Sequence, residues 1–441
     1  MKTVCSMSYL IIEGRRKLQG AIATQSNKNS ALAILFASLM IKGKTTLVDL
    51  PAIDDVEQVL ALFISIGVKV KRPASGEVVI DATHPLALEH MDPAVTKRIR
   101  ASLLLWGALA ARAQNYKVYK SGGCHLGERT VRPHFYALQK FGVTVTSHEK
   151  YYAVQNAPLK AAAVTMYESG DTTTENVIMA AVLSPGTTTI KMASANYMVQ
   201  DLCYFLNRAG AKIIGIGSTT LVITGVKKLR PVTQYPIMPD PIAAMTFIAA
   251  AIVTGSHLLI KNCPLEFLEL ELCKLEVMGQ KYKLKNKRQS KNGAFQIVDV
   301  EIFPSTLTAL PDKIYGRPFP GLNIDNLPLF IPILLTAHGR TLVHDWAYEN
   351  RAVYSLDLQK LGAHITLLDP HRLWVEGPTK FVPAELTCPP ALRPAVNVLI
   401  AMLAAPGTSI LRGTDTIDRG YENIYALLNK AGAHIEIRSE K

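Results

Sequence analysis

The sequence predicts an α/β protein of two domains, because one helix-strand-helix-strand pattern recurs six times along 441 residues. In each copy a glycine follows an apolar helix and precedes a strand with alternating apolar side chains: Gly67, Gly142, Gly210, Gly279, Gly362 and Gly432. Glycine suits the left-handed position just past the end of a helix. A unit of roughly 70 residues, repeated six times, covers most of the chain and fits two domains of three units.

Within each unit, periodicity assigns the elements in order. In the first unit, residues 31–40 form an apolar helix, and the segment from Gly43 opens a strand. Val56, Val59 and Phe63 then recur at helical spacing before Gly67 ends the second helix. A glycine equivalent to Gly43 stands about 24 residues before the helix-ending glycine in every unit except the second; the others are Gly186, Gly255, Gly339 and Gly407.

Composition excludes several classes of protein. The longest apolar stretches, 245–253 and 396–405, are shorter than the ~18 residues that span a bilayer, so we expect no membrane insertion. The N-terminus carries no hydrophobic signal core, and the six cysteines show no CxxC pair or zinc spacing. We therefore expect a cytoplasmic protein with free thiols, no metal and no cofactor.

The net charge of +13 is concentrated partly in residues 281–291, which hold five lysines and one arginine. A solvated strand and loop is favoured over a nucleic-acid patch, because no recognised nucleic-acid motif accompanies these cations. The role of this segment and the oligomeric state stay open at this point.

Four cations stand at the predicted starts of helices, where acidic residues are normally preferred. They are Lys28, Arg100, Arg393 and Arg419. Each placement is unfavourable unless an anion binds there, and the four occupy matching places in repeated units. Together they predict a convergent pocket for phosphate and carboxylate groups.

A glycine-rich loop, residues 121–127, presents Cys124 next to Arg129. Glycines allow close approach of a ligand, and neighbouring cations lower the pKa of a thiol. The loop therefore predicts a reactive cysteine that faces an anion.

Two acids, Asp240 and Asp325, stand at the corresponding helix starts of the fourth and fifth units. Aspartate is an ordinary N-cap residue, which explains both; the functional interpretation is that one of them is a general base. The residues themselves do not choose between them.

Six motifs, in this order along the chain, resemble the UDP-N-acetylglucosamine 1-carboxyvinyltransferase family from about Leu10 to Ile437. They are Lys28-Asn29-Ser-Ala-Leu, Arg100-Ala-Ser, Gly122-Gly-Cys-His-Leu-Gly127 with Arg129, Tyr348-Glu-Asn-Arg351, Leu392-Arg393 and Asp418-Arg419-Gly-Tyr-Glu422. The resemblance implies an inside-out α/β barrel of two domains, residues 28–238 and residues 1–27 plus 239–441. It also implies that the first strand, near residues 9–13, joins the second domain, and that the active site lies between the domains.

The resemblance further implies transfer of the enolpyruvyl group of phosphoenolpyruvate to the 3-hydroxyl of UDP-N-acetylglucosamine, the first committed step of peptidoglycan precursor synthesis. Cys124 would be the proton donor and the residue that fosfomycin alkylates, and its loop would act as a lid. Asp325 would be the general base, so the resemblance favours Asp325 over Asp240. The substrate-binding groups would be Lys28, Asn29, Arg100, Arg129, Tyr348, Arg351, Arg393 and Arg419.

Departures from the family pattern concern the acceptor side. Thr130-Val131-Arg132-Pro133 replaces a Pro-Val-Asp-Leu segment that contacts uracil, and Asn196 and Met198 replace two glutamates. Residues 171–176 also differ, and Ala391 stands where an acid is usual. Three alternatives therefore stay open: an enolpyruvyl transferase for another uridine nucleotide, a relative of the shikimate-pathway enzyme, and a non-catalytic paralogue that binds a sugar nucleotide. The shikimate-pathway relative is disfavoured, because its Leu-Pro-Gly-Ser-Lys-Ser and Gly-Asn-Ala-Gly-Thr signatures are missing and the cysteine loop is present.

Overall fold

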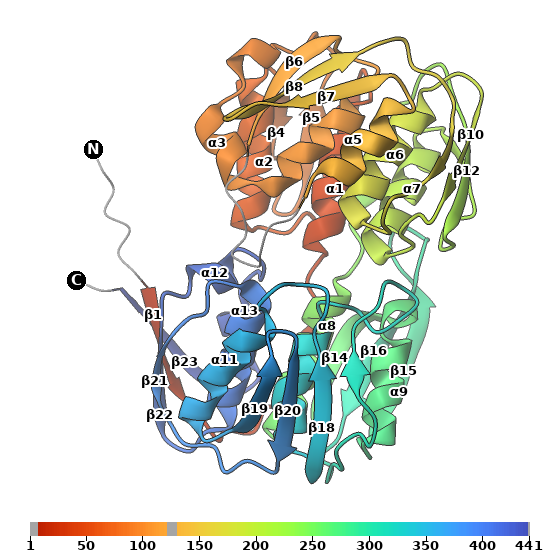
Figure 1. Ribbon diagram of the computed structural model, residues 1–441. Helices are drawn as coiled ribbons and strands as arrows, with labels where there is room; N and C mark the ends of the chain where they lie inside the picture. Colours follow the sequence, from red (N-terminus) through yellow and green to blue (C-terminus); the bar gives the residue numbers. More distant parts are fainter. Residues whose placement is uncertain (1–7, 121–129, 440–441) are drawn as a thin grey trace.

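The computed structural model describes residues 8–120 and 130–439, and it shows two lobes joined by two chain segments (Figure 1). We call residues 28–238 the N-terminal lobe and the remainder the C-terminal lobe. These bounds follow the predicted domains, and the division at these residues stays a prediction.

The N-terminal lobe contains α1 (Lys28–Ser38), β3 (Lys44–Val48), α2 (Asp54–Ser65), β4 (Lys69–Lys71), β5 (Val78–Asp81), η1 (Leu88–His90), α3 (Pro93–Arg98), η2 (Arg100–Leu104), α4 (Leu105–Ala108), β6 (Asn115–Tyr119), α5 (Arg132–Gln139), β7 (Val143–Ser147), β8 (Tyr151–Asn156), β9 (Ala163–Thr165), α6 (Asp171–Val182), β10 (Thr187–Lys191), α7 (Tyr197–Arg208), β11 (Lys212–Ile214), β12 (Thr220–Thr224) and β13 (Tyr235–Pro236).

The C-terminal lobe contains β1 (Ser8–Glu13), β2 (Ala21–Ala23), α8 (Pro241–Val253), β14 (Leu258–Pro264), η3 (Leu265–Phe267), α9 (Glu269–Val277), β15 (Tyr282–Gln289), β16 (Gln296–Ile302), β17 (Ile314–Tyr315), η4 (Leu327–Leu329), α10 (Phe330–Leu334), β18 (Gly339–His344), η5 (Ala352–Leu361), β19 (His364–Asp369), β20 (Arg372–Gly377), β21 (Glu385–Thr387), α11 (Leu392–Ala404), β22 (Thr408–Arg412), α12 (Asp415–Asp418), α13 (Ile424–Lys430) and β23 (His434–Ser439).

The described residues form six sheets, which correspond to the six predicted units. Each sheet has more strands than the two of a predicted unit: four in five of the sheets, and three in the sheet of β6, β7 and β8. In the first unit, β5 returns antiparallel between β3 and β4, and β13 adds a fourth strand parallel to β3. β5 was not predicted from periodicity, because a turn at residues 72–77 separates it from the helix-glycine-strand signal.

The six helix-ending glycines adopt the left-handed conformation that the sequence predicts. Their φ angles are 84° at Gly67, 94° at Gly142, 99° at Gly210, 89° at Gly279, 89° at Gly362 and 108° at Gly432. A side chain at these positions would strain the backbone. The repeat is therefore encoded largely by where a helix must end.

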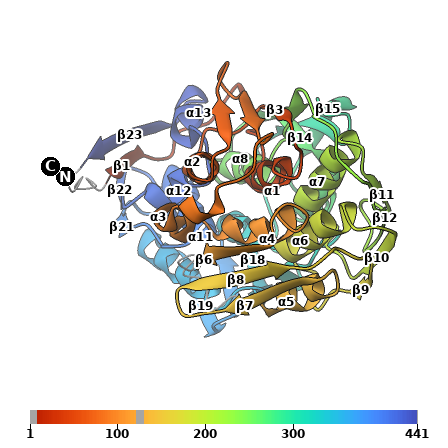
Figure 2. The same cartoon turned by 90° about the horizontal axis from the view of Figure 1, so that it is seen from above.

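Apolar helices such as α1 and α8 lie inside the lobes and the sheets lie outside, which is the predicted inside-out α/β barrel (Figures 1 and 2). Every residue of α8 is buried, and α1 is buried from Ser30 to Ser38. A helix that is apolar on all sides has to be enclosed by other elements. Among the described residues, none of the helices combines the length and apolar character that crossing a membrane requires.

The first strand belongs to the C-terminal lobe, as the resemblance implies. β1 lies between β22 and β23 and pairs with both in antiparallel register, for example Ile11 with Ile410 and with Glu436. The chain therefore starts in the C-terminal lobe, crosses to the other lobe and later returns.

The two crossing segments pair with each other. The backbone N–H of Asn27 donates to the carbonyl of Met238 at 2.8 Å, and that of Asp240 donates to the carbonyl of Gln25 at 2.8 Å. Beside them, the buried carboxyl of Asp201 on α7 accepts hydrogen bonds from the Tyr235 hydroxyl at 2.7 Å and from Asn292 Nδ2 at 3.0 Å. Asn292 is in the turn between β15 and β16, so Asp201 joins both lobes at the crossing point.

Candidate active site

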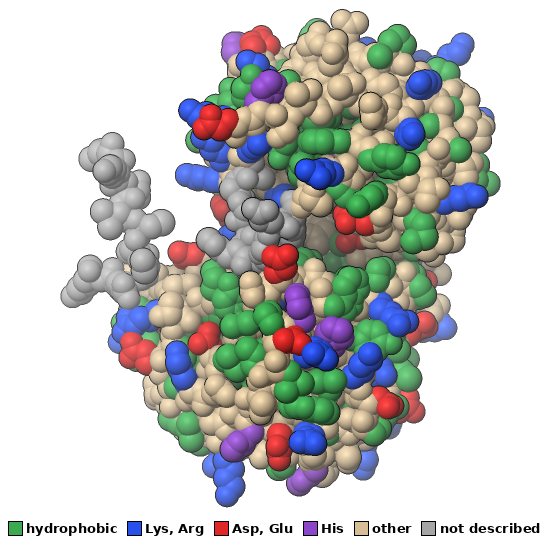
Figure 3. All heavy atoms as spheres, viewed as in Figure 1, with side chains coloured by type: hydrophobic (Ala, Val, Ile, Leu, Met, Phe, Trp, Pro, Cys, Tyr) green, Lys and Arg blue, Asp and Glu red, His purple; other side chains and the backbone are tan. Residues whose placement is uncertain are grey.

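A cleft of about 1260 Å³ lies between the lobes, and both lobes contribute to its walls. Figure 3 shows the molecule hollowed between its two halves. The predicted site residues within the described ranges all line this cleft: Lys28, Asn29, Arg100, Asp325, Tyr348, Arg351, Arg393 and Arg419. Cys124 and Arg129 lie outside the described residues.

One carboxylate, Asp55, lies between two of the predicted cations. Its Oδ2 is 2.8 Å from Lys28 Nζ, and its Oδ1 is 3.6 Å from Arg419 Nη2. Lys28 comes from the first turn of α1, Asp55 from the first turn of α2, and Arg419 from the opposite lobe. Two cations that share a single acid keep a net positive charge, which suits an anionic ligand.

Asp55 was missed in the sequence because acids are usual in the first turn of a helix, where Asp54 and Glu57 also lie. Spacing gives no sign that Asp55, unlike Asp54, turns into the cleft. Its partners become visible only when the lobes are placed together.

The predicted position of Arg419 at a helix start is wrong. Arg419 directly follows α12, and the next helix begins only at Ile424. Asn423 has a left-handed backbone, with a φ of 54°, which prevents a helix from running through from Tyr421. A cation after a helix is favourable without any ligand, so the helix-start argument holds for Lys28 and Arg393 but not for Arg419.

Arg100 also departs from the predicted context. In place of the one helix predicted to start at Arg100, the structure has the 3-10 turn η2, which Arg100 begins, and then the single turn α4. Gly107 in α4 packs against Asn176, whose Oδ1 accepts its N–H at 2.7 Å; a Cβ there would lie 2.4 Å from the Asn176 carbonyl oxygen. Close contact with α6 therefore shapes this segment more than helix propensity does.

A second cluster is centred on Asp325 in the C-terminal lobe. Arg351 Nη1 lies 3.1 Å from Asp325 Oδ1, and Arg393 Nε lies 3.7 Å from Asp325 Oδ2. Arg351 is 2% exposed, and Asp345 accepts from its Nε at 2.6 Å and its Nη2 at 2.8 Å. Burial lowers the pKa of Arg351, but the charge and hydrogen bonds of Asp345 outweigh it, so Arg351 stays a cation.

Most donors of Arg351 are thus used within the protein, since its Nη2 also donates to the carbonyl of Ile324 at 2.7 Å. The ring of Tyr348 covers its guanidinium, with 4.4 Å between the ring centroid and Cζ. This arrangement fixes the direction of the Asp325 carboxylate. Arg351 lines the cleft mainly as a support for Asp325.

Glu271 of α9 stabilises the turn that carries Asp325. Glu271 was not identified from the sequence as a site residue. Glu271 Oε1 accepts from the N–H of Asn323 at 3.1 Å and from Asn326 Nδ2 at 2.8 Å. Asn323 Oδ1 in turn accepts the N–H of Asp325 at 2.8 Å. A glutamate on a predicted helix has no sequence signature of such a role.

The structure separates the two acids that the sequence left equivalent. Asp240 is 4% exposed and caps α8, with its Oδ1 accepting from the N–H groups of Ile242 at 2.8 Å and Ala243 at 3.3 Å. Asp325 lines the cleft, and 28% of its side chain is exposed there. Geometry therefore favours Asp325 for proton transfer.

Arg393, in the first turn of α11, completes the cation set of the C-terminal wall. Its Nη1 donates to the Tyr421 hydroxyl at 2.9 Å, and that hydroxyl lies 2.8 Å from Thr246 Oγ1. Burial lowers the pKa of Arg393, but the charges of Tyr421 and Asp325 raise this pKa by more than burial lowers it, so the net shift is upward. A permanently charged, oriented guanidinium results.

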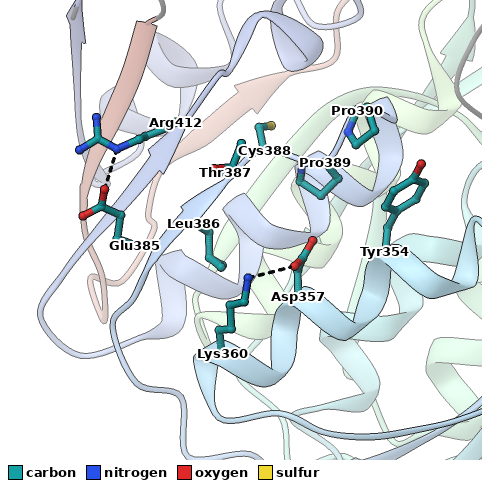
Figure 4. A pocket seen from close by; sticks show the side chains of 10 residues that line it. All are labelled: Tyr354, Asp357, Lys360, Glu385, Leu386, Thr387, Cys388, Pro389, Pro390 and Arg412. Carbon is teal, nitrogen blue, oxygen red and sulfur yellow. Dashed lines mark hydrogen bonds and ion pairs between the residues drawn. The ribbon is translucent and has the colours of Figure 1, made fainter.

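Outside the cleft, a hollow of about 450 Å³ lies on the C-terminal lobe between η5 and β21 (Figure 4). Its charged side chains pair with one another: Arg412 Nε lies 2.6 Å from Glu385 Oε1, and Lys360 Nζ lies 3.5 Å from Asp357 Oδ1. The matched charges offer an anion no advantage there. Within the described ranges, no group of three His, Cys, Asp or Glu side chains is arranged to hold a metal ion.

Comparison with known proteins agrees with this geometry. The sequence profile of the family described as EPSP synthase (3-phosphoshikimate 1-carboxyvinyltransferase) matches residues 12–428. The chain is 33% identical to the UDP-N-acetylglucosamine 1-carboxyvinyltransferase of Dichelobacter nodosus, over 98% of this chain and 99% of that protein. It belongs to the enolpyruvyl transferase family. Another relative of the same name, from Bradyrhizobium diazoefficiens, is 34% identical over 97% of both chains.

Solved structures of enolpyruvyl transferases share the fold. The enolpyruvyl transferase NikO from Streptomyces tendae superposes with a TM-score of 0.84, at 22% identity over 99% of this chain and 100% of that one. EPSP synthase from Acinetobacter baumannii gives 0.77 at 21% identity, over 98% of this chain and 100% of that one. The predicted resemblance and fold class are thus confirmed.

Proposed function

We propose that this enolpyruvyl transferase moves the enolpyruvyl group of phosphoenolpyruvate to the 3-hydroxyl of UDP-N-acetylglucosamine and releases phosphate. The observation that carries the proposal is a base and an anion site that face one cleft: the supported carboxylate of Asp325 in the C-terminal lobe, and the Lys28–Asp55–Arg419 group, which spans both lobes. The names of the relatives at 33–34% identity support the same acceptor.

The reaction needs both features. Asp325 removes the proton of the sugar hydroxyl as its oxygen bonds to C2 of phosphoenolpyruvate, while a second group protonates C3. Loss of phosphate from the resulting tetrahedral adduct, together with a C3 proton, restores the double bond. Lys28, Arg393 and Arg419 bind the phosphate and carboxylate and stabilise the charge that develops.

Sequence resemblance assigns the C3 proton donor to Cys124, and a further phosphoenolpyruvate contact to Arg129. Asn29, Arg100 and Tyr348 complete the substrate-binding set on the cleft walls. The product would feed peptidoglycan synthesis, and therefore cell shape and division, in the cytoplasm.

The proposal is tested by measuring phosphate release from phosphoenolpyruvate with UDP-N-acetylglucosamine, UMP, UDP-glucose or shikimate 3-phosphate as acceptor. Release that depends on UDP-N-acetylglucosamine supports the proposal. Release with a different acceptor would show that the enzyme acts in another pathway. No release with any acceptor would favour a non-catalytic paralogue that binds a sugar nucleotide.

Fosfomycin, an epoxide, provides an independent test of the thiol. Mass spectrometry is expected to find a single adduct on Cys124, and the Cys124→Ser variant is expected to stay unlabelled. An adduct on the exposed Cys273, which lines the same cleft, would contradict the assignment.

A further inference from the structure

A carboxylate on the N-terminal wall, Asp171, has no part in the roles described above. It is the first residue of α6 and lines the cleft opposite Asp325. Ser194 Oγ donates to its Oδ1 at 2.5 Å, and Asn196 Nδ2 donates to its Oδ2 at 3.3 Å. Each oxygen has one protein donor and keeps the capacity to accept another hydrogen bond.

The two donors are themselves fixed by the backbone around them. The N–H of Ser194 donates to Thr174 Oγ1 at 3.0 Å, and Asn196 caps α7 by accepting the N–H of Tyr197 at 3.0 Å. Asn196 is one of the positions at which this chain departs from its family. The orientation of Asp171 is therefore built into the starts of two helices.

One turn further along α6, the buried carboxyl of Glu175 lies in the same wall of the cleft. It is 2% exposed, lines the cleft, and forms no hydrogen bond or ion pair with any group of the described residues. Burial raises the pKa of Glu175, and the charge of Asp171 raises it further. Buried carboxyls normally have hydrogen-bond partners, so a ligand with N–H or O–H groups fits this wall better than an anion.

On the basis of the proposed function, we infer that Asp171 determines acceptor specificity by accepting a hydrogen bond from a donor group adjacent to the reacting hydroxyl of the sugar. Asp325 holds the reacting hydroxyl from the opposite lobe. The ring carbons on either side of it carry donors, which in UDP-N-acetylglucosamine are the 4-hydroxyl and the 2-acetamido N–H. Burial raises the pKa of Asp171 and the charge of Asp325 raises it further, which agrees with the two carboxyls lying near each other.

Two analogues change one donor each: UDP-N-acetylgalactosamine inverts the 4-hydroxyl, and UDP-glucose replaces the acetamido group by a hydroxyl. The test measures calorimetric Kd values and phosphate release for the three nucleotides with wild-type protein and Asp171→Ala. A hydrogen bond to a charged group corresponds to about a tenfold to hundredfold change in affinity. We expect the wild type to prefer UDP-N-acetylglucosamine over at least one analogue by that factor, and Asp171→Ala to lose the preference while its KM for phosphoenolpyruvate is unchanged.

Asp54→Ala is the matched control, because Asp54 is also an acid in the first turn of an N-terminal-lobe helix but is exposed outside the cleft. Asp171→Asn keeps the shape of the side chain if the alanine variant is unstable, and it should lose most of the preference. A preference retained in both Asp171 variants would overturn the inference. Tight binding without phosphate release would contradict the transfer reaction and still leave specificity measurable, whereas no binding of UDP-N-acetylglucosamine would overturn both.

Discussion

Two groups of cations in this molecule, one in the cleft and one in the hairpin of β15 and β16, are paired with acids in different ways. In the cleft, Asp55 serves both Lys28 and Arg419. In the hairpin of β15 and β16, each paired cation has an acid of its own, at 2.8 Å in every case: Lys285 with Glu301, Arg288 with Asp299, and Lys291 with Asp49. A run of cations in a sequence therefore does not by itself identify an anion site; the convergence of two cations on one acid is what marks the cleft.

The hairpin has two structural roles that explain its many lysines. β15 is the edge strand of its sheet, and lysines on an edge strand discourage pairing with other chains. At its tip, Lys291 contacts Asp49 and Asn292 contacts Asp201, both in the N-terminal lobe. The hairpin links the lobes at one side, and the cleft opens between them.

The largest effect is expected from Asp325→Asn. The amide cannot remove a proton, so kcat should fall about 10²- to 10⁴-fold while phosphoenolpyruvate still binds. Steady-state phosphate release and calorimetry measure the two quantities. Asp357→Asn, on the surface of the C-terminal lobe, is the control and should behave as wild type; a fall of less than about tenfold in Asp325→Asn would rule out the base assignment.

A smaller effect is expected when the charge balance of the cleft is changed. Lys28→Gln removes one of the two cations at Asp55, leaving Arg419 matched by one acid as in the hairpin. The KM for phosphoenolpyruvate should rise about tenfold to hundredfold, because a charged hydrogen bond to an anion is lost. Lys44→Gln, an exposed lysine of β3, is the control. An unchanged KM in Lys28→Gln would show that the anion binds elsewhere.

The comparison also shows what the sequence could reveal. The repeat was predictable, since helix ends need glycine at defined places and apolar helices need enclosure, and both signals are local. The residues that contact ligands in the family were predictable because whole motifs are retained. Lys28 and Arg393 were further marked by an unfavourable position in the first turn of a helix.

Residues that act through distant contacts were not predictable. Asp55 and Glu271 are acids on helices, and nothing in their spacing distinguishes them from solvent-exposed neighbours. Their roles come from Arg419 and from Asn326, which lie far away in the sequence. Strands that join a sheet from a distant part of the chain, such as β13 beside β3, were missed for the same reason, since their pairing is set by the fold and not by local periodicity.

A third prediction concerns the junction that the hairpin makes with the N-terminal lobe. Burial raises the pKa of Asp201 from 3.8 to about 7, against the opposing hydrogen bond from Tyr235. Between these values the folded chain holds a proton that the unfolded chain has released, so rising pH destabilises the fold up to about pH 7. Asp201→Asn removes this dependence.

Melting temperatures from pH 5 to pH 8 test the junction. The wild type should lose about 2 °C or more relative to Asp201→Asn as the pH rises. Asp299→Asn is the matched control in the hairpin: hydrogen bonds from Asn286, Asn262 and Arg288 outweigh burial and lower the pKa of Asp299 below 3.8, so its difference from wild type should stay constant over this range. A constant difference for Asp201→Asn as well would mean that its carboxyl is ionised in the folded protein.

The smallest effect is expected in the hairpin itself. Lys281 and Lys287 are exposed, and neither forms an ion pair with the described residues. Because such charges are screened by salt and lie outside the cleft, Lys281→Gln combined with Lys287→Gln should leave kcat/KM within about twofold of wild type. Fluorescence anisotropy with a single-stranded RNA at physiological salt completes the test. Micromolar binding that the double variant loses would show that these two lysines recruit an anionic partner. No binding by either protein would leave the convergence of two cations on one acid, rather than charge density, as the property that separates the cleft from the hairpin.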